Sequence, residues 1–510
     1  MTNTPDTRPP APGTASASGV SRRPDTSGSL RAIARPRHSR TRAALAVAAG
    51  RATGVLSRRL RLGGGTSLPG LVALRIDPGL PAYLGAQLRQ GSIVVTGTNG
   101  KTTTSGLVTE VLRAAGHRVW RNREGSNLMR GVATSLLIRA RPDGKLRGGG
   151  DASAVFEVDE AAFPAVVAAL QPRAIVITNL FRDQLDRYGE VDTVAEKWRL
   201  ALSKLPPTTT LILNADDPAV AALADSDREA PVVYYGVEEA PIVTAGREPG
   251  DCAEVIDTRT CARCHAVLEF SQRFYSHIGH WSCPSCGYRR PDPLVRARGI
   301  HPDALAGTVF QLETPAGVTE ARVELPGLYN VYNALAAAAV GVTVGAETPR
   351  IREAIARFRP AFGRAERIAV GDKTVQLLLA KNPTGLNEVL RALGMMEGRH
   401  HLLLALSDKA ADGEDVSWIW DADYERVPGI AAYVTTTGTR AYDLALRLKY
   451  TGQPPQHIEP DFGRALTHAL EHTPSGSTLY IVPTYTAMLA IRGELAHRGY
   501  TPQYWEQQDE

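Results

Sequence analysis

A short apolar strand that runs into a glycine-rich turn and then a helix is the feature that most constrains this chain. Ser92–Thr96 is rich in β-branched residues, and it leads into G-T-N-G-K-T and a predicted helix over about residues 102–115. Glycines let backbone N–H groups approach an anion, and the first turn of a helix carries partial positive charge. The arrangement therefore predicts a phosphate-binding loop, in which Lys101 contacts the outer phosphates of ATP and the Thr102 hydroxyl is a Mg²⁺ ligand. The predicted loop residues are Gly97, Thr98, Asn99, Gly100, Lys101, Thr102 and Thr103.

Strands and helices alternate along most of the remaining chain. Strands that alternate with helices indicate a parallel-rich sheet with crossover connections, and a chain of 510 residues is long enough for two or three domains. We therefore predict an α/β fold with a central P-loop ATPase domain over residues 41–362 and a Rossmann-like domain over 363–510. The further strands are expected at 155–158, 174–178, 211–214, 375–379, 401–406, 431–436 and 478–482, and a helix at 331–344.

Positive charge is concentrated at the N-terminal end. The net charge is +5, but residues 1–62 hold twelve Arg, no Lys and two Asp, so they carry +10 and the rest of the chain carries −5. A mildly acidic body argues against a nucleic-acid-binding surface. Residues 1–40 are rich in Pro, Ser, Thr, Gly and Arg, so we expect a disordered basic leader. Contact of the leader with an anionic membrane surface is the alternative.

A first helix is predicted at residues 41–62, where Leu45, Val47, Val55 and Leu56 lie among Ala and Arg. We expect this helix to pack on the next domain; a helix lying on a membrane surface is the alternative. The sequence has no apolar run of the roughly 18–20 residues that a membrane span needs. It also has no signal-peptide pattern, so we expect a cytoplasmic protein.

A module inserted at about residues 250–300 contains two C-x2-C pairs with eighteen residues between them. This spacing is typical of a zinc ribbon, in which four thiolates hold one structural Zn²⁺ and leave no open position. Disulfides are the alternative, disfavoured in a cytoplasmic chain. Arginines and aromatic residues in the module raise nucleic-acid binding as a minor possibility, while Cys252 is expected to be an unpaired thiol. The predicted ligands are Cys261, Cys264, Cys283 and Cys286.

The loop and several later motifs resemble the Mur-ligase superfamily. Its members use ATP to convert a carboxylate into an acyl phosphate, which removes the negative charge and supplies a leaving group before an amine attacks. Thr178-Asn179-Leu180 and Asp183-Gln184-Leu185-Asp186 resemble the family's T-N-x…D-H-L-D segment, with Gln184 in place of the usual His. The resemblance implies that Glu157 binds Mg²⁺, that Asn330 and Asn333 contact adenine, that Arg364 approaches the phosphates, and that Lys197 is either a carbamylated Mg²⁺-bridging lysine or an ordinary surface lysine.

The last domain narrows the resemblance to the MurT family, the synthetase subunits of lipid II isoglutaminyl synthase. The four-cysteine insert, D-V-S-W-I-W-D at 415–421 and P-T-Y-T-A-M at 483–488 carry this likeness, which covers about residues 43–497. It implies ATP-dependent amidation of the α-carboxyl of D-glutamate in the lipid II stem peptide at the inner face of the plasma membrane. The resemblance also implies that the ammonia comes from a separate GatD-type glutaminase subunit. The assignment of four of the five cysteines to zinc fits the need for such a partner.

The resemblance also implies that an acidic cluster in the last domain contacts the glutaminase subunit. Asp412 would orient the catalytic histidine of the glutaminase, with Asp408 and Asp415 beside it, although Lys409 replaces the usual Asn. A solvated acidic loop in which Asp415 caps a helix is the alternative. Trp418 and Trp420 are expected either at an interdomain or partner surface or in the core.

Two other functions remain open. One is a self-contained amino-acid ligase of the Mur or folylpolyglutamate synthase type, which would need no glutaminase; the ribbon and the S-W-I-W-D segment disfavour it. The other is a non-catalytic ATP-binding scaffold, in which Glu157 and the two asparagines at the adenine site would be superfluous.

Overall fold

The computed structural model describes residues 39–59, 67–122, 125–182, 191–225, 230–238, 257–303, 306–359 and 364–502. Almost all of the predicted leader, Cys252 and the segment 183–186 lie outside the described residues, so the predictions made for them stay predictions. The domain boundaries predicted after residues 40 and 362 also stay predictions.

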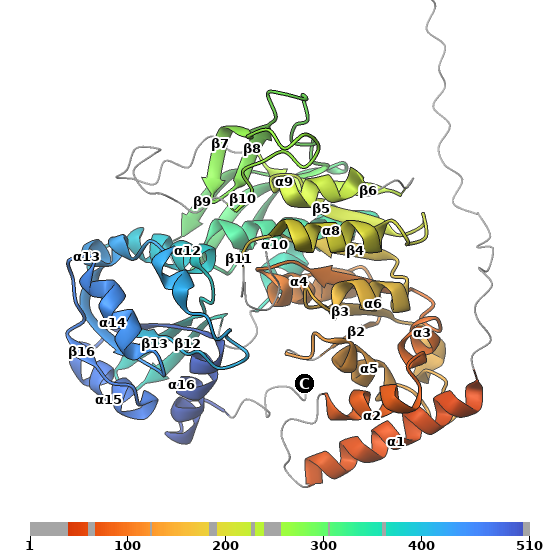
Figure 1. Cartoon of the computed structure of the whole chain (residues 1–510), viewed down its shortest axis with the longest axis horizontal. Helices are drawn as coiled ribbons and strands as arrows, with labels where there is room; N and C mark the ends of the chain where they lie inside the picture. Colours follow the sequence, from red (N-terminus) through yellow and green to blue (C-terminus); the bar gives the residue numbers. More distant parts are fainter. Residues whose placement is uncertain are drawn as a thin grey trace, which may run out of the picture. The chain divides into compact units, whose positions relative to one another are not determined.

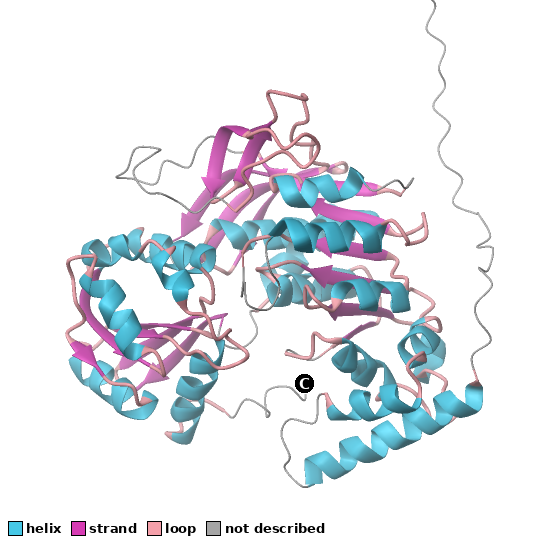
Figure 2. Cartoon of the chain, viewed as in Figure 1, coloured by secondary structure: helices cyan, strands magenta, loops and turns pink. Residues whose placement is uncertain are grey.

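The phosphate loop belongs to a nine-stranded sheet in the order β11-β10-β9-β6-β5-β4-β1-β3-β2, with helices on both faces (Figures 1 and 2). The seven strands from β9 to β2 in this order pair in parallel, and only β10 and β11 run antiparallel to their neighbours. The prediction of a parallel-rich α/β sheet is confirmed. The strands are β1 (Ser92–Thr96), β2 (Val119–Arg121), β3 (Ser153–Glu157), β4 (Ala174–Ile177), β5 (Thr210–Asn214), β6 (Val232–Val237), β9 (Val295–Asp303), β10 (Gly307–Thr314) and β11 (Gly317–Val323).

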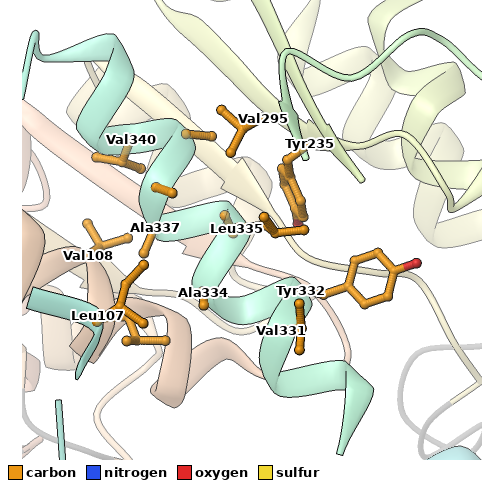
Figure 3. Packing of buried hydrophobic residues seen from close by; sticks show 14 of the residues in the cluster. Leu107, Val108, Tyr235, Val295, Val331, Tyr332, Ala334, Leu335, Ala337 and Val340 are labelled. Atoms are coloured by element: carbon orange, nitrogen blue, oxygen red, sulfur yellow. The ribbon is translucent and has the colours of Figure 1, made fainter. Parts of the chain in front are cut away.

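Both faces of this sheet are buried because successive side chains of a strand point to opposite faces. In β1, Ile93 and Val95 join an apolar cluster with α4, α10 and α11, whereas Val94 joins a second cluster under α3, α5, α6 and α8. Figure 3 shows the alanine-rich α10 crossing the first cluster beside Leu107 and Val108 of α4. The helices are α1 (Arg40–Arg59), α2 (Leu68–Ile76), α3 (Leu80–Gly85), α4 (Lys101–Ala114), α5 (Met129–Leu137), α6 (Phe163–Leu170), α8 (Val191–Leu202), α9 (Pro218–Ala221), α10 (Leu328–Thr343) and α11 (Thr348–Arg357).

The cysteine module, residues 257–294, lies between β6 and β9 in the chain. It contains a separate two-stranded antiparallel sheet of β7 (Glu269–Tyr275) and β8 (Ile278–Ser282). The C-x2-C pairs flank this hairpin, one on each side. The described part of the insert is therefore a separate hairpin module that lies in the chain between two neighbouring parallel strands.

The last domain has a six-stranded sheet in the order β12-β13-β17-β14-β15-β16. All of its pairs are parallel except β12 with β13, and an apolar cluster covers each face. The four strands predicted for this region are confirmed. The elements are β12 (Arg364–Val370), β13 (Lys373–Leu378), α12 (Pro383–Gly394), β14 (His400–Ala405), η3 (Ser417–Trp420), η4 (Tyr424–Arg426), α13 (Val427–Ile430), β15 (Ala431–Thr437), α14 (Ala441–Lys449), β16 (His457–Ile458), α15 (Phe462–His472), β17 (Thr478–Pro483) and α16 (Tyr485–His497).

The first helix, α1, packs along α2, as Figure 1 shows, and also meets α3 and α5. This confirms that the helix packs on the next domain. Among the described residues, none of the helices combines the length and the apolar character that crossing a bilayer requires.

Candidate active site

Two glycines determine the shape of the phosphate loop between β1 and α4. Gly97 has φ 132° and Gly100 has φ 84°, values that residues with a side chain rarely adopt. A Cβ atom on Gly97 would overlap the hydroxyl of Thr178, and one on Gly100 would overlap the amide oxygen of Asn333. The loop backbone is thus packed too closely against its neighbours for any other residue, and it leads directly into the positive end of the 14-residue helix α4.

The stretch after β4 holds this loop in place. The backbone N–H of Asn99 donates to Asn179 Oδ1 at 2.8 Å, and Asn179 Nδ2 donates back to the Asn99 carbonyl oxygen at 3.1 Å. The Thr98 hydroxyl donates to the carbonyl oxygen of Phe181 at 3.1 Å and accepts from its N–H at 3.0 Å. The part of the T-N-x…D-H-L-D-like segment that the structure describes therefore lies against the loop.

Thr102 and Glu157, the two predicted Mg²⁺ ligands, lie side by side. Thr102 Oγ1 donates to Glu157 Oε1 at 2.9 Å, and both residues are buried. Glu157 ends β3, so its carboxylate stands at the carboxyl edge of the sheet where ligands bind in such folds. Asn122 holds the Glu157 backbone with two hydrogen bonds of 2.9 Å. A carboxylate beside a hydroxyl is a donor set that suits Mg²⁺, so these residues fit the ion.

Lys101 is paired with Glu160, a residue that the sequence analysis did not single out. Lys101 Nζ lies 3.1 and 3.0 Å from the two carboxylate oxygens of Glu160, and it donates to the carbonyl oxygens of Gly97 at 2.6 Å and Thr98 at 3.1 Å. Both partners are buried. The ammonium is thus neutralised within the loop. The sequence does place a second carboxylate near this edge of the sheet, because Glu160 follows Glu157 by three residues in E-V-D-E at 157–160.

Asn330 and Asn333 are buried between α10 and the loop. Thr104 Oγ1 donates to Asn333 Oδ1 at 3.0 Å, and Asn333 Nδ2 donates to Asn330 Oδ1 at 3.0 Å. Asn330 Nδ2 in turn donates to the carbonyl oxygen of Pro326 at 2.6 Å. These bonds join α10 to α4, which gives both asparagines a packing role beside the loop. Their contact with adenine stays a prediction.

The remaining predicted nucleotide-site residues are placed differently. Thr103 is buried in the first turn of α4. Lys197 is exposed on α8, next to Trp198, whose indole N–H donates to the carbonyl oxygen of Glu160 at 3.1 Å. Arg364 is the first residue of β12, and its side chain lies outside the described part of the chain. The roles of Lys197 and Arg364 stay predictions.

Asp412 is buried at the N-terminus of α16 and is only 5% exposed. The backbone N–H of Thr486 donates to its two oxygens at 3.0 and 3.3 Å, and the Thr486 hydroxyl also donates to the carboxylate. Burial raises the pKa of Asp412, while the bonds from Thr486 oppose that shift. In this arrangement the Asp412 carboxylate accepts hydrogen bonds from the first turn of α16, and little of its surface is exposed to a partner. Its role in orienting the catalytic histidine of a glutaminase stays a prediction.

Asp408 and Asp415 are more accessible than Asp412. The Thr439 hydroxyl donates to Asp408 at 2.8 Å and lowers the pKa of Asp408, with help from Arg440 at 3.3 Å. The backbone N–H of Ser417 donates to Asp415 at 2.8 Å and lowers its pKa. This bond closes a turn just before η3, whose N-cap residue is Val416 and has no side-chain cap, so Asp415 does not occupy the helix-cap position of the alternative.

The two tryptophans of η3 differ in exposure: one packs against the core and the other lies on the surface. Trp418 packs partly against the core of the last domain. Trp420 is exposed, with its ring edge-to-face to Tyr450 at 5.4 Å and the Arg447 guanidinium over it at 5.5 Å.

The four cysteines converge as the spacing predicts. Their sulfur atoms all lie within 4.8 Å of one another, with Cys261 and Cys286 3.6 Å apart and Cys264 and Cys283 3.4 Å apart. Zn–S bonds of about 2.3 Å in a tetrahedron place sulfurs roughly 3.8 Å apart, so the cluster fits a structural ion. All four are free thiols, so the disulfide alternative is wrong. Hydrogen bonding from the Cys286 backbone lowers the pKa of Cys283 to about 7, which favours the thiolate.

A buried acidic turn after β5 attaches the cysteine module to the sheet. Asp216 is fully buried and accepts from Arg290 Nε at 2.5 Å, the Tyr332 hydroxyl at 2.6 Å and the Val237 N–H at 2.8 Å. Burial raises the pKa of Asp216, and Arg290 opposes that shift.

Asp217, the next residue, connects the same turn to the phosphate loop. Its Oδ2 atom lies 3.4 Å from His277 Nε2 of the module and accepts from the Leu180 N–H at 2.9 Å. Leu180 follows Asn179, which holds the phosphate loop. Asp217 therefore lies between the module and the segment that holds the loop: it accepts a hydrogen bond from Leu180, whereas its approach to His277 is a close contact without a hydrogen bond. Sequence reasoning missed both contacts.

A parallel-rich ATPase sheet with this loop, followed by a second α/β domain, defines the chain as an enzyme of the Mur-ligase class. Residues 95–251 match the family described as Mur ligase middle domain, and residues 379–488 match MurT ligase C-terminal. The fold is similar to a pseudomurein peptide ligase type C from Methanothermus fervidus, with a TM-score of 0.62 and 22% identity over 81% of this chain and 80% of that one. It is also similar to MurF from Acinetobacter baumannii, with a TM-score of 0.60 and 18% identity over 84% of this chain and 80% of the other.

Two relatives are named lipid II isoglutaminyl synthase (glutamine-hydrolyzing) subunit MurT. The one from Streptococcus pneumoniae is 33% identical over 86% of this chain and 94% of its own length. The one from Staphylococcus aureus is 32% identical over 84% of this chain and 93% of its own length. The chain belongs to the MurT family, and it is a ligase.

Proposed function

We propose that this chain uses ATP to activate the α-carboxyl of D-glutamate in the lipid II stem peptide and that ammonia then converts it to the amide of D-isoglutamine. The observation that carries the proposal is the convergence of Lys101, Thr102 and Glu157 at one glycine-shaped loop. The names of the MurT relatives supply the substrate class. The step belongs to peptidoglycan synthesis, and we place it at the inner face of the membrane that holds the lipid-linked precursor.

The reaction balances as two displacements. A carboxylate oxygen attacks the γ-phosphorus of ATP, and the bond to the bridging oxygen breaks to release ADP. Ammonia next attacks the carbonyl carbon of the acyl phosphate, inorganic phosphate leaves with the former carboxylate oxygen, and the nitrogen loses a proton. The protein contributes positioning and charge neutralisation rather than covalent chemistry.

Each loop residue has a defined part in this scheme. The backbone N–H groups of the loop and the N-terminus of α4 bind the phosphates. Lys101 exchanges Glu160 for the outer phosphates, while Thr102 and Glu157 hold Mg²⁺. When bound, Mg²⁺ offsets negative charge on the phosphate oxygens. The four cysteines would hold Zn²⁺, and the ion would keep the cysteine module folded beside the Asp217–Leu180 contact behind the loop.

Ammonia is supplied by a separate GatD-type glutaminase subunit. Four of the five cysteines of this chain converge in one cluster that fits a zinc ion, which leaves little provision for a cysteine nucleophile of its own. The relatives are named as subunits of a glutamine-hydrolysing synthase, which supports a complex. Asp412 contacts the partner's histidine only if its bonds to Thr486 are rearranged on assembly.

The test is co-expression with a candidate glutaminase, followed by mass spectrometry of lipid II incubated with ATP, Mg²⁺ and glutamine. We expect the mass change of hydroxyl to amide in the wild-type complex, its loss in Lys101→Ala, and its retention in Lys204→Ala, a matched exposed lysine. An unchanged lipid II mass in an assembled, ATP-hydrolysing wild-type complex would overturn the substrate assignment. Activity with a free amino acid in place of ammonia would instead favour the self-contained ligase, and full activity of Lys101→Ala would favour the scaffold.

A further inference from the structure

The largest apolar side chains of α1 face away from the protein. The inward face that packs on α2 carries small residues such as Ala43, Ala46 and Gly50. On the outward face, Leu45 is 62% exposed and Leu56 is 57% exposed. A helix whose only task is to cover a domain normally has the reverse arrangement, with large apolar residues inside.

These outward residues form one stripe along the helix. Leu45, Ala48, Ala52 and Val55 follow one another at intervals of three and four residues, which places them on one face of an α-helix, and all are exposed. Leu56 borders the same face. We define Leu45, Ala48, Ala52, Val55 and Leu56 as the α1 stripe.

Arginines flank the α1 stripe, and the helix contains no acidic residue. Arg40 and Arg51 are eleven residues apart, close to three helical turns, so they lie on one edge of the stripe. Arg40 is exposed, whereas Arg51 is half-buried and donates to the carbonyl oxygen of Ala140 at 2.8 Å. Arg42 lies on the other edge and is exposed. In total, α1 has five arginines, and residues 1–62 carry +10 while the rest of the chain carries −5.

We propose that the α1 stripe lies on an anionic lipid bilayer, with its apolar side chains among the headgroups and its arginines beside the lipid phosphates. An apolar face bordered by arginines and free of carboxylates is the pattern of a helix that lies in a membrane interface. Charge complementarity selects a lipid surface over a second copy of the chain, because the body of that copy is only mildly acidic. The use of this surface, to reach a lipid-linked substrate, rests on the proposed function, but the binding itself does not.

The test is co-sedimentation of the full chain with vesicles of phosphatidylcholine alone and of phosphatidylcholine mixed with phosphatidylglycerol. The variant is Leu45→Glu with Leu56→Glu, and the matched control is Leu200→Glu with Val318→Glu, two exposed apolar residues on α8 and β11 (58% and 64% exposed). All four side chains are exposed, so the fold should survive, which circular dichroism and thermal unfolding would verify.

We expect binding to the anionic vesicles that weakens with salt and is absent for phosphatidylcholine alone. The stripe variant should lose about tenfold or more of its partition coefficient, because it exchanges buried leucines for charges that anionic lipid repels. The control pair should bind like the wild type. No binding of the wild type, or unchanged binding of the stripe variant, would overturn the proposal; the second result would assign any binding to the segment before α1.

Two further readouts separate the competing explanations. If the wild type fails to bind vesicles and the stripe variant lowers its molar mass in light scattering, the stripe is an interface between copies and the proposal is wrong. Amidation of a water-soluble, short-chain substrate should be equal in wild type and variant. If the wild type binds vesicles but amidates neither substrate, only the proposed function fails.

Discussion

Replacing Arg290 by alanine should cost the central domain much of its stability, because it leaves a carboxylate fully buried without its counter-ion. Asp216 is 0% exposed, and Arg290 provides its only charged contact among the hydrogen bonds described, at 2.5 Å. The Tyr332 hydroxyl and the Val237 N–H remain, but neutral donors do not balance a buried charge. Breaking a buried pair by removing one partner typically costs about 3–5 kcal/mol.

The size of this loss depends on pH in a predictable direction. Burial already raises the pKa of Asp216, and loss of Arg290 should raise it further. A carboxyl whose folded-state pKa lies above its unfolded value of about 3.9 lowers the free energy of unfolding at every pH where the unfolded form is ionised. As the pH rises above about 3.9 this loss grows, and it stops growing once the folded form ionises too. The deficit of Arg290→Ala should therefore be largest near neutral pH and shrink as the pH falls toward 5.

The assay is thermal unfolding of the metal-loaded protein, with Arg289→Ala as the matched control because Arg289 is exposed. At about 2 °C per kcal/mol for a domain of this size, Arg290→Ala should lower the first transition by about 6–10 °C. In an Asp216→Asn background the same substitution should cost less, because the fully buried carboxylate is gone and only the partly exposed Glu238, 2.6 Å from Arg290 Nη1, still loses its partner. Equal losses in both backgrounds, or a loss no larger than that of Arg289→Ala, would refute the reasoning.

Three further outcomes follow from the site and the last domain. Chelating the metal from the four cysteines should unfold the cysteine module and weaken binding of a fluorescent ATP analogue, since Leu180 loses support behind the loop; unchanged circular dichroism and affinity would contradict this. Glu160→Gln should tighten ADP binding several-fold in calorimetry, because it removes the carboxylate that competes with phosphates for Lys101, and weaker binding would show that Glu160 supports the loop instead. Burial lowers the pKa of His400 below its unfolded value of about 6.5. The free energy of unfolding should therefore decrease by up to about 1.4 kcal/mol per pH unit as the pH falls below about 6.5, because the unfolded form binds the proton first. His400→Asn should flatten that slope in urea unfolding, and an identical slope would contradict the assignment.

The features that sequence predicts well here are local. The strand Ser92–Thr96, the glycine turn and α4 follow one another without a gap, so apolar periodicity and two glycines are enough to identify the loop. The C-x2-C pairs predict their own convergence because four thiolates have few other uses at that spacing. Glu157 is predicted from the resemblance to the Mur-ligase superfamily; the structure places it 2.9 Å from Thr102, and its role toward Mg²⁺ stays a prediction.

What sequence did not reveal depends on contacts between distant segments. Glu160 stands in a turn, and only the fold brings it to Lys101. Asp216 belongs to a turn that the sequence marks as Ala-Asp-Asp-Pro, which is ordinarily exposed; it is buried because Arg290 and the cysteine module cover it. In α1, helical periodicity alone does not say which face packs inward. The face with alanine and glycine packs inward because its small side chains allow α1 to approach α2 closely.

The most direct test of the account follows an oxygen atom. Lipid II labelled with ¹⁸O in the α-carboxyl of D-glutamate would be amidated by the complex with ATP, Mg²⁺ and ammonia, and the released phosphate would be analysed by mass spectrometry. Activation through an acyl phosphate predicts one ¹⁸O atom in inorganic phosphate for each amide formed, because the carboxylate oxygen leaves with phosphorus. Amide formation with unlabelled phosphate would contradict the role assigned to the phosphate loop.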